Sequence, residues 1–169
     1  PLARERGLAL SIETPESLYA SVDREGLTKI ISNLLTNAIK YSETYIHIRL
    51  YSEGERLLLS VCNDGLVIPV EMREEIFKPF IQYKTGALRS VPGTGIGLAL
   101  ARSLVELHEG TLCMEDSMEN NCFLLSLPLK HEQTVAMEHK EPVTGGESSE
   151  ESGAGTALEQ HRYTLLVVE

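Results

Sequence analysis

The chain has 169 residues, a hydrophobic fraction of 42% and a formal net charge of −10 at pH 7. This length fits one domain with a core of its own, and the acidic balance argues against nucleic-acid binding, which needs a basic face. No apolar run approaches the roughly 20 residues that cross a bilayer, and no signal peptide is recognisable, so we expect a soluble, cytoplasmic protein.

The first half of the chain predicts two short strands, a long helix and a hairpin. Asp23 is a good N-cap for a helix that runs to about Tyr41. Apolar and polar residues alternate on both sides of a turn at 52–55, which indicates two paired strands. The strands are predicted over residues 8–13, 18–22, 45–51 and 56–62.

The second part predicts a short helix, a polar loop, a second long helix and a final hairpin. Gly110 is expected near the C′ position that ends the second helix. The order of elements indicates an α/β fold, a two-layer sandwich in which helices cover one face of a mixed, mostly antiparallel sheet. The predicted ranges are 71–77 and 94–108 for the helices, 81–92 for the loop, and 111–115 and 121–127 for the strands.

Composition changes sharply near Leu129. Residues 131–161 are rich in Glu, Ser, Gly and Thr, and they predict a flexible acidic linker. An apolar run at 163–169 is typical of a buried strand. Since the chain starts at Pro1 without a methionine and stops inside this run, we expect a piece of a longer protein. The three cysteines (Cys62, Cys113 and Cys122) lack paired metal spacing and are predicted to be reduced thiols.

The first long helix has a polar face beside its apolar stripe. Asn33, Asn37 and Lys40 lie at positions i, i+4 and i+7. Asparagine is a mediocre residue inside a helix, because its amide competes for backbone hydrogen bonds. Amide oxygens are suitable ligands for Mg²⁺, and the ammonium group of a lysine can meet a phosphate. The same residues are equally compatible with an ordinary solvated face.

Two glycine-containing segments stand at the ends of predicted elements. Residues 93–98, Gly-Thr-Gly-Ile-Gly-Leu, stand at the start of the second long helix, where free N–H groups and close backbone approach favour phosphate. They match neither a dinucleotide fingerprint nor a Walker loop. Residues 63–69, Asn-Asp-Gly-Leu-Val-Ile-Pro, follow a strand directly. A tight packing turn and an ordinary Asn-Asp-Gly turn are the alternative interpretations.

Taken in order, these segments resemble the catalytic domain of sensor histidine kinases, whose fold is the Bergerat-type ATP-binding fold. Asn33–Ser42 resembles the N box of that family, Asn63–Pro69 its first glycine box, Ile76–Phe80 its F box and Gly93–Leu98 its second glycine box. The resemblance covers residues 1–130. Residues 162–169 resemble the first strand of a receiver domain, although any buried strand would look similar. Together they imply a hybrid kinase.

The resemblance implies a role for each matching residue. Asn37, with Asn33 beside it, would bind Mg²⁺, and Asn33 and Lys40 would act at the transferred phosphate. Tyr41 would lie against the adenine of ATP. The remaining nucleotide contacts would be Asn63, Asp64, Gly65 and Ile68 of the first glycine box, Gly93, Thr94, Gly95, Gly97 and Leu98 of the second, and Lys84, with Arg89, in the lid between them.

Two residues depart from the family pattern. Asn63 stands where the family has the aspartate that reads the adenine amino group, and Asp64, the next residue, is the alternative if the register shifts. Val67 replaces the second glycine of that box. A degenerate nucleotide-binding module therefore stays open as an alternative.

The reaction class depends on Asn33. Hydrolysing members of the superfamily have a glutamate there as general base, and an amide cannot take a proton near neutral pH. The residues therefore favour phosphoryl transfer to a histidine over hydrolysis.

The acceptor histidine would lie in a dimerisation segment that this sequence lacks. The expected partners are that phosphoacceptor domain and a receiver domain; the chain itself would be monomeric, and its parent a homodimer that is cytoplasmic or anchored through a sensor region. A serine kinase of the same fold, acting on a partner protein, is a further alternative.

Overall fold

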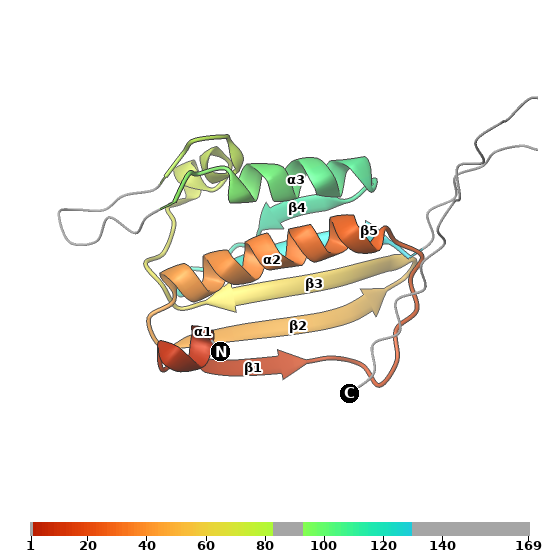
Figure 1. The fold of residues 1–169 in the computed structure, drawn as a ribbon, viewed down its shortest axis with the longest axis horizontal. Coiled ribbons are helices and arrows are strands. Elements are labelled where there is room, and N and C mark those ends of the chain that lie inside the picture. The colour runs from red at the N-terminus through yellow and green to blue at the C-terminus, as the bar shows by residue number, and fades with distance from the viewer. Residues whose placement is uncertain (1, 83–92, 130–169) are drawn as a thin grey trace, which may run out of the picture.

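The computed structural model describes residues 2–82 and 93–129, which form one open sheet with helices on one face (Figure 1). The strand order is β1-β2-β3-β5-β4, with β1 and β2 parallel and all other neighbours antiparallel. The predicted mixed, mostly antiparallel sheet is confirmed. The strands are β1 (Ala9–Glu13), β2 (Tyr45–Glu53), β3 (Arg56–Asn63), β4 (Thr111–Met114) and β5 (Asn121–Pro128), and the α-helices are α1 (Leu2–Glu5), α2 (Arg24–Tyr41) and α3 (Gly97–Leu107).

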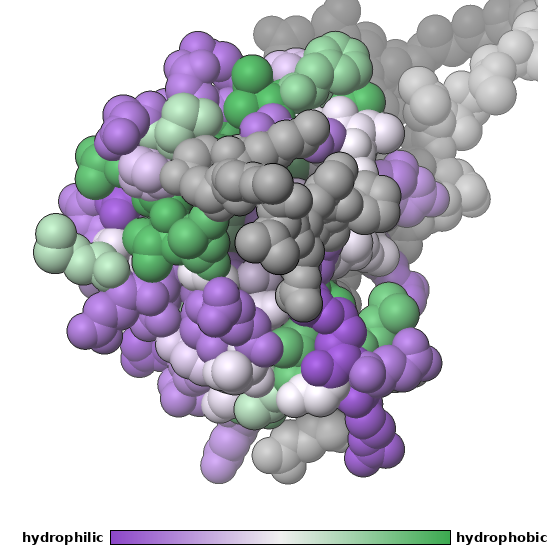
Figure 2. Space-filling view, turned by 90° about the vertical axis from the view of Figure 1, so that its left-hand side faces the viewer, coloured by the Kyte–Doolittle hydropathy of each residue, from purple (hydrophilic) through white to green (hydrophobic). Residues whose placement is uncertain are grey.

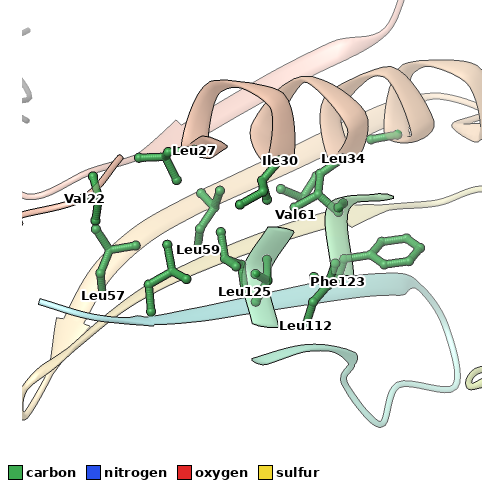
Figure 3. Close-up of a cluster of buried hydrophobic side chains, with 14 of the residues drawn as sticks. Val22, Leu27, Ile30, Leu34, Leu57, Leu59, Val61, Leu112, Phe123 and Leu125 are labelled. Atoms are coloured by element: carbon green, nitrogen blue, oxygen red, sulfur yellow. The ribbon is translucent and has the colours of Figure 1, made fainter. Parts of the chain in front are cut away.

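The helix α2 begins where the sequence predicts. The Asp23 side chain accepts hydrogen bonds from the backbone N–H groups of Glu25 and Gly26, both at 3.0 Å, and so caps the first turn. The helix buries one apolar stripe against the sheet, and Figure 3 shows three of its side chains pointing toward β3 and β5. The fully buried members of the stripe are Leu27, Ile30, Leu34 and Ala38.

The central strands β3 and β5 carry the other half of the core. Alternate residues of each strand face α2 and α3, because successive side chains of a strand point to opposite faces. The core-facing residues of the two strands are Leu57, Leu59, Val61, Phe123, Leu125 and Leu127, each no more than 6% exposed. Phe77, from the turn that precedes the glycine loop, packs edge-on against Phe123 with 6.2 Å between ring centroids.

The helix α3 starts later than the predicted residue 94, for a local steric reason. Gly95 adopts a φ of 69°, and a Cβ on it would lie 2.9 Å from the Ile81 carbonyl oxygen, so the chain is not yet helical there. At the other end Glu109, with a φ of 55°, takes the left-handed position that is predicted near Gly110. Gly110 is instead needed because a Cβ would lie 2.5 Å from the Ser126 carbonyl oxygen.

Two further predicted elements differ from the structure. The sequence predicts a strand over residues 18–22, but only Ser21 makes a bridge, donating its N–H to the Leu129 carbonyl at 2.9 Å. The predicted helix 71–77 is two separate 3-10 turns, η1 (Val70–Met72) and η2 (Glu75–Phe77). No helix within the described residues is long and apolar enough to cross a membrane. The predicted linker and the predicted receiver strand lie outside the described residues.

The prediction that all three cysteines are reduced thiols is wrong for two of them. Cys62 of β3 and Cys122 of β5 are bonded as a disulfide, with their Cα atoms 4.0 Å apart. They are 60 residues apart in the sequence, and only the register of β3 against β5 places them directly opposite each other. Cys113 alone is free.

Candidate functional site

The predicted site residues gather at one end of the molecule. The C-terminus of α2, the last residue of β3 and the N-terminus of α3 all lie at the left of Figure 1. Figure 2 views this end directly and shows apolar patches among hydrophilic side chains. Three apolar side chains that flank the glycine loops are exposed at this end. They are Leu66 at 56%, Phe80 at 75% and Ile96 at 39%.

The polar face of α2 forms one side of the site. The Nδ2 atom of Asn33 donates to the Lys29 carbonyl within the helix at 3.0 Å. Its Oδ1 atom is left facing Gly97 at the start of α3. The Asn37 side chain has no hydrogen-bond partner within residues 2–82 and 93–129, and Lys40 makes no ion pair with any of those residues. The Lys40 ammonium lies 4.9 Å from the centroid of the Tyr41 ring. Asn33, Asn37 and Lys40 are therefore available to a polar ligand.

The second glycine loop is packed directly against this face. A Cβ on Gly97 would lie 3.1 Å from Asn33 Oδ1, and a Cβ on Gly93 would overlap the Lys40 ammonium. The loop is also fastened to the F box, because the Gly95 carbonyl accepts the Phe80 N–H at 2.9 Å. Thr94 is exposed, and Leu98 packs against the core. Gly95 is thus needed for a left-handed turn, and the lack of a side chain at Gly97 leaves room for the Asn33 amide.

The N-terminus of α3 offers unpaired donors beside that loop. No side chain caps Ile96, and the first backbone bond of the helix is donated by Leu100 to the Ile96 carbonyl at 2.8 Å. The N–H groups of Gly97, Leu98 and Ala99 consequently have no partner within the helix. Such a helix end attracts anions, through both its N–H groups and its dipole.

The first glycine loop closes the opposite side of the site. Asn63, the last residue of β3, is 1% exposed, and its Nδ2 atom has no hydrogen-bond partner among the described residues. A buried amide without a partner is costly, so it marks a place where a ligand would complete the bonding. Gly65 follows in contact with the Tyr41 carbonyl, where a Cβ would overlap backbone atoms. The Tyr41 side chain is 39% exposed.

Asp64 has a structural role instead: its carboxylate binds the backbone of the turn at 43–45 that follows α2. Its carboxylate accepts backbone N–H bonds from Glu43 at 3.0 Å, Thr44 at 2.9 Å and Tyr45 at 3.1 Å, and it also accepts the Thr44 hydroxyl. Burial raises the pKa of this carboxyl, but the bonds from the Thr44 side chain and from the three backbone groups outweigh burial and lower the pKa to about 2. Asp64 is thus an ionised anchor whose oxygens are already engaged.

Asn121 is a residue of this site that sequence reasoning missed. It is 3% exposed and faces Asn63 across the β3–β5 pair. Its Oδ1 atom accepts the Ile68 N–H at 2.8 Å, while its Nδ2 atom donates to the carbonyls of Gly65 at 3.2 Å and Leu66 at 2.9 Å. The loop at 65–68 is therefore held from a strand more than 50 residues away in sequence. Asn121 is the first residue of β5, and no periodic pattern in the sequence indicates that its side chain binds this loop.

Val67, which replaces a glycine of the family pattern, does not distort the loop. Within the described residues, only Phe80 and Glu109 among non-glycines adopt a positive φ. The loop therefore does not use the conformational freedom of glycine at this position. Of the predicted contacts, Lys84 and Arg89 lie outside the described residues, and the others lie at the same end of the fold.

The arrangement suits a ligand with an aromatic base at one end and phosphates at the other. Asn63 offers a buried amide, and an amide can present either an acceptor oxygen or donor hydrogens. Tyr41, whose backbone lies against the same glycine loop, is partly exposed and provides an aromatic ring. The α3 N-terminus and Lys40 supply positive potential for an anion. Asn33 and Asn37 supply amide oxygens, which are hard ligands that fit Mg²⁺.

Comparison with known proteins gives a consistent result. A family model described as histidine kinase-, DNA gyrase B- and HSP90-like ATPase matches residues 22–131. The sensor histidine kinase TmoS of Ectopseudomonas mendocina is 36% identical over 132 residues, which cover 76% of this chain but only 14% of that protein.

Solved structures agree with the sequence match. The catalytic domain of the histidine kinase ThkA, in a nucleotide-free form, superposes with a TM-score of 0.67 and 30% identity, covering 76% of this chain and 83% of that one. Full-length ShkA in complex with AMPPNP superposes with a TM-score of 0.64 and 25% identity, covering 76% of this chain and 27% of that one.

Proposed function

Because the chain belongs to the histidine kinase-, DNA gyrase B- and HSP90-like ATPase family, and its relatives are sensor histidine kinases, we propose that it binds Mg-ATP and supplies the γ-phosphoryl group to a histidine. That histidine would lie in a dimerisation helix of the parent protein. The transfer would serve two-component signal transduction.

The observation that carries the proposal is the closure of both glycine loops onto α2. In the second glycine loop, Gly97 lies against the Asn33 side chain and Gly93 lies against the Lys40 ammonium. In the first glycine loop, Gly65 contacts the Tyr41 carbonyl. Backbone can approach phosphates closely only where side chains are absent. The unpaired buried amide of Asn63 supports the adenine end of the same site, since adenine offers both a donor and an acceptor to an amide.

Transfer is favoured over hydrolysis by the chemistry of Asn33. An amide does not accept a proton near neutral pH, so it cannot activate a water molecule. A histidine acceptor needs no such base, because its neutral imidazole is already a nucleophile. Phosphoryl transfer then depends on positioning and charge stabilisation. Lys40 would neutralise phosphate charge, and the N–H groups at the start of α3 would orient the phosphates.

A divalent cation would be held by Asn37, with Asn33 beside it. When bound, Mg²⁺ supplies charge neutralisation for the phosphates of ATP. The two asparagines lie one turn apart on α2, so they share a helix face. We further propose that Asn63 reads the base while Asp64 positions the turn after α2, since the Asp64 carboxylate is already engaged.

The parent protein would provide what this chain lacks. The partners we propose are a phosphoacceptor histidine domain, through which the parent would dimerise, and a receiver domain beyond the acidic segment at 131–161. This chain alone would be monomeric. Its ATP chemistry would take place in the cytoplasm, whether or not the parent is anchored in a membrane.

Calorimetric titration with ATP and with a non-hydrolysable analogue, with and without Mg²⁺, tests the nucleotide site. We expect Mg²⁺-dependent binding, and we expect Asn37→Ala to weaken it at least about tenfold. Thr36→Ala, on an exposed position of the same helix turn, is the matched control and should bind as the wild type does. Transfer is then tested by supplying a helical phosphoacceptor segment and measuring acid-labile phosphohistidine.

The outcomes separate the proposal from its alternatives. A wild-type chain that binds no nucleotide under any condition would contradict it and point to a degenerate module. Binding without transfer to histidine, together with acid-stable phosphate on a serine of a partner, would identify a serine kinase of the same fold. Equal binding by Asn37→Ala and wild type would remove Asn37 from the metal site.

A further inference from the structure

Cys62 and Cys122 form a cross-strand pair on the face of the sheet opposite α2 and α3. Their neighbours in register, Val61 and Phe123, point into the core, so the two cysteines point to the other face. Cys62 is half-buried and Cys122 is 9% exposed. Cys62 is therefore the more exposed residue of the pair, and we expect a reagent to reach it first.

The disulfide lies directly beneath the candidate nucleotide site. The next register pair along the two strands is Asn63 opposite Asn121. Asn63 carries the unpaired buried amide, and Asn121 holds the loop at 65–68 through three hydrogen bonds. The covalent link therefore joins β3 and β5 one residue away from both side chains, at the end of the sheet where the strands would otherwise separate first.

We propose that Cys62 and Cys122 are a reversible thiol-oxidation site, whose oxidised state holds the floor of the nucleotide site in register. The second half of this proposal rests on the proposed ATP function, whereas the first half does not. In the cytosol, where glutathione and thioredoxin keep thiols reduced, a disulfide within a protein is usually transient or redox-sensing. The oxidation state of Cys62 and Cys122 would thus change the nucleotide affinity of the site.

The chemistry balances as a thiol–disulfide exchange with a small-molecule disulfide of the glutathione type. The Cys62 thiolate attacks one sulfur of the reagent, breaks its S–S bond and releases one small thiol after that group takes up a proton. The Cys122 thiolate then attacks the Cys62 sulfur of the mixed disulfide, forms the Cys62–Cys122 bond and releases the second small thiol. The two protein thiols lose two protons and two electrons, and the reagent gains both.

Strand register distinguishes this pair from the third cysteine, because Cys113 of β4 lies opposite Leu124 and not opposite a cysteine. The Ser60 hydroxyl lies 3.5 Å from Cys62 Sγ and 3.3 Å from the Glu115 carboxylate, so the pair faces polar groups. Burial, and next the charge of Glu115, raise the pKa of the Cys113 thiol, which keeps Cys113 in its unreactive thiol form. Cys113 is therefore the matched control.

The test equilibrates the whole chain in glutathione buffers of graded potential and counts free thiols, with the mass of the intact chain as a second readout. With three cysteines in the chain, we expect one free thiol under oxidising conditions and three under reducing conditions, with full reversal. Reduction should lower the thermal midpoint by roughly 10 °C and weaken Mg-ATP binding about fivefold or more. Cys113→Ser should behave like the wild type, and Cys122→Ser should stay at the reduced affinity.

Different results would overturn the oxidation site, its link to ATP binding, and the proposed function. Three free thiols at every potential would overturn the oxidation site, as would stoichiometric zinc held by Cys62, Cys122 and Glu115 in the reduced chain, since these three could together ligate a metal. Equal ATP affinity in both redox states would overturn the link to the nucleotide site. If neither state binds ATP, the proposed function fails, while the thiol count and the thermal midpoint still decide the oxidation site.

Discussion

The Asp64 carboxylate allows a quantitative test of how the site is held together. The substitution Asp64→Asn keeps the shape of the side chain but removes its charge. Four hydrogen-bond donors in residues 43–45, namely three backbone N–H groups and the Thr44 hydroxyl, then face a neutral amide. Hydrogen bonds to a charged acceptor are stronger than those to a neutral one, so the turn after α2 should be destabilised.

The size of this effect follows from the pKa. Burial pushes the pKa of Asp64 up, but the bonds from Thr44, Tyr45 and Glu43 lower it from 3.8 to about 2. Nearly two pKa units, at about 1.36 kcal/mol each, give an upper bound of about 2.4 kcal/mol for the free energy of unfolding. The carboxylate is partly open to solvent, which screens the interaction, so we expect about 1 kcal/mol at neutral pH.

The pH dependence has a definite sign. A carboxyl whose pKa is lower in the folded state stabilises the fold fully above its unfolded value, which is close to 4, and this stabilisation is lost as the pH falls toward 2. The difference in unfolding free energy between wild type and Asp64→Asn should therefore be constant from about pH 5 to 7 and shrink below about pH 4. Urea unfolding followed by circular dichroism measures it, and Glu43→Gln, an exposed carboxyl next to the same turn, is the control.

Two results would refute this reasoning. One is a difference between the two chains that does not change with pH, which would mean that the ionised form is not what the donors stabilise. The other is an Asp64→Asn chain that folds normally at pH 7 but has lost all ATP binding. Asp64, and not Asn63, would then be the residue that reads the base.

Three further substitutions test the framework of the site. Gly65→Ala places a Cβ in contact with the Tyr41 carbonyl, so we expect a loss of about 3 kcal/mol in urea unfolding. Gly54→Ala places its Cβ in open space and should cost only the strain of an alanine at a φ of 57°, about 1 kcal/mol. Asn121→Ala leaves the Ile68 N–H without its partner, so we expect a loss of about 2–4 kcal/mol together with weaker ATP binding by calorimetry; an unchanged ATP affinity would separate this loop from the nucleotide. Asp23→Ala removes the cap of α2 and should cost about 1 kcal/mol, whereas Asp23→Asn should retain most of that stability.

The parts of the fold that follow local chemistry were predictable. Asp23 and the apolar stripe after it define α2 to within a residue, because capping and a 3.6-residue period are both local signals. The two hairpins follow from alternation on either side of a turn. The mixed, mostly antiparallel sheet with helices on one face follows from the order of these elements along the chain.

The parts that depend on strand register were not predictable from one sequence. Two contacts join residues more than 50 positions apart: the Cys62–Cys122 disulfide, and the hydrogen bonds from Asn121 to the loop at 65–68. No pattern near any of these residues shows which strand lies opposite. The predicted start of α3 is wrong because the left-handed turn at Gly95 is set by contact with Ile81, which is also a tertiary effect.

The register pair of Asn63 and Asn121 also sets an order of events during synthesis on the ribosome. A nascent chain that has emerged as far as Leu107 already contains α2, both glycine loops and the whole of α3. It lacks β5, so the Ile68 N–H and the Gly65 carbonyl have nothing to hold them. The pocket thus matures only when β5 is inserted between β3 and β4, which are already made, and a ligand that binds there would select for chains that contain β5.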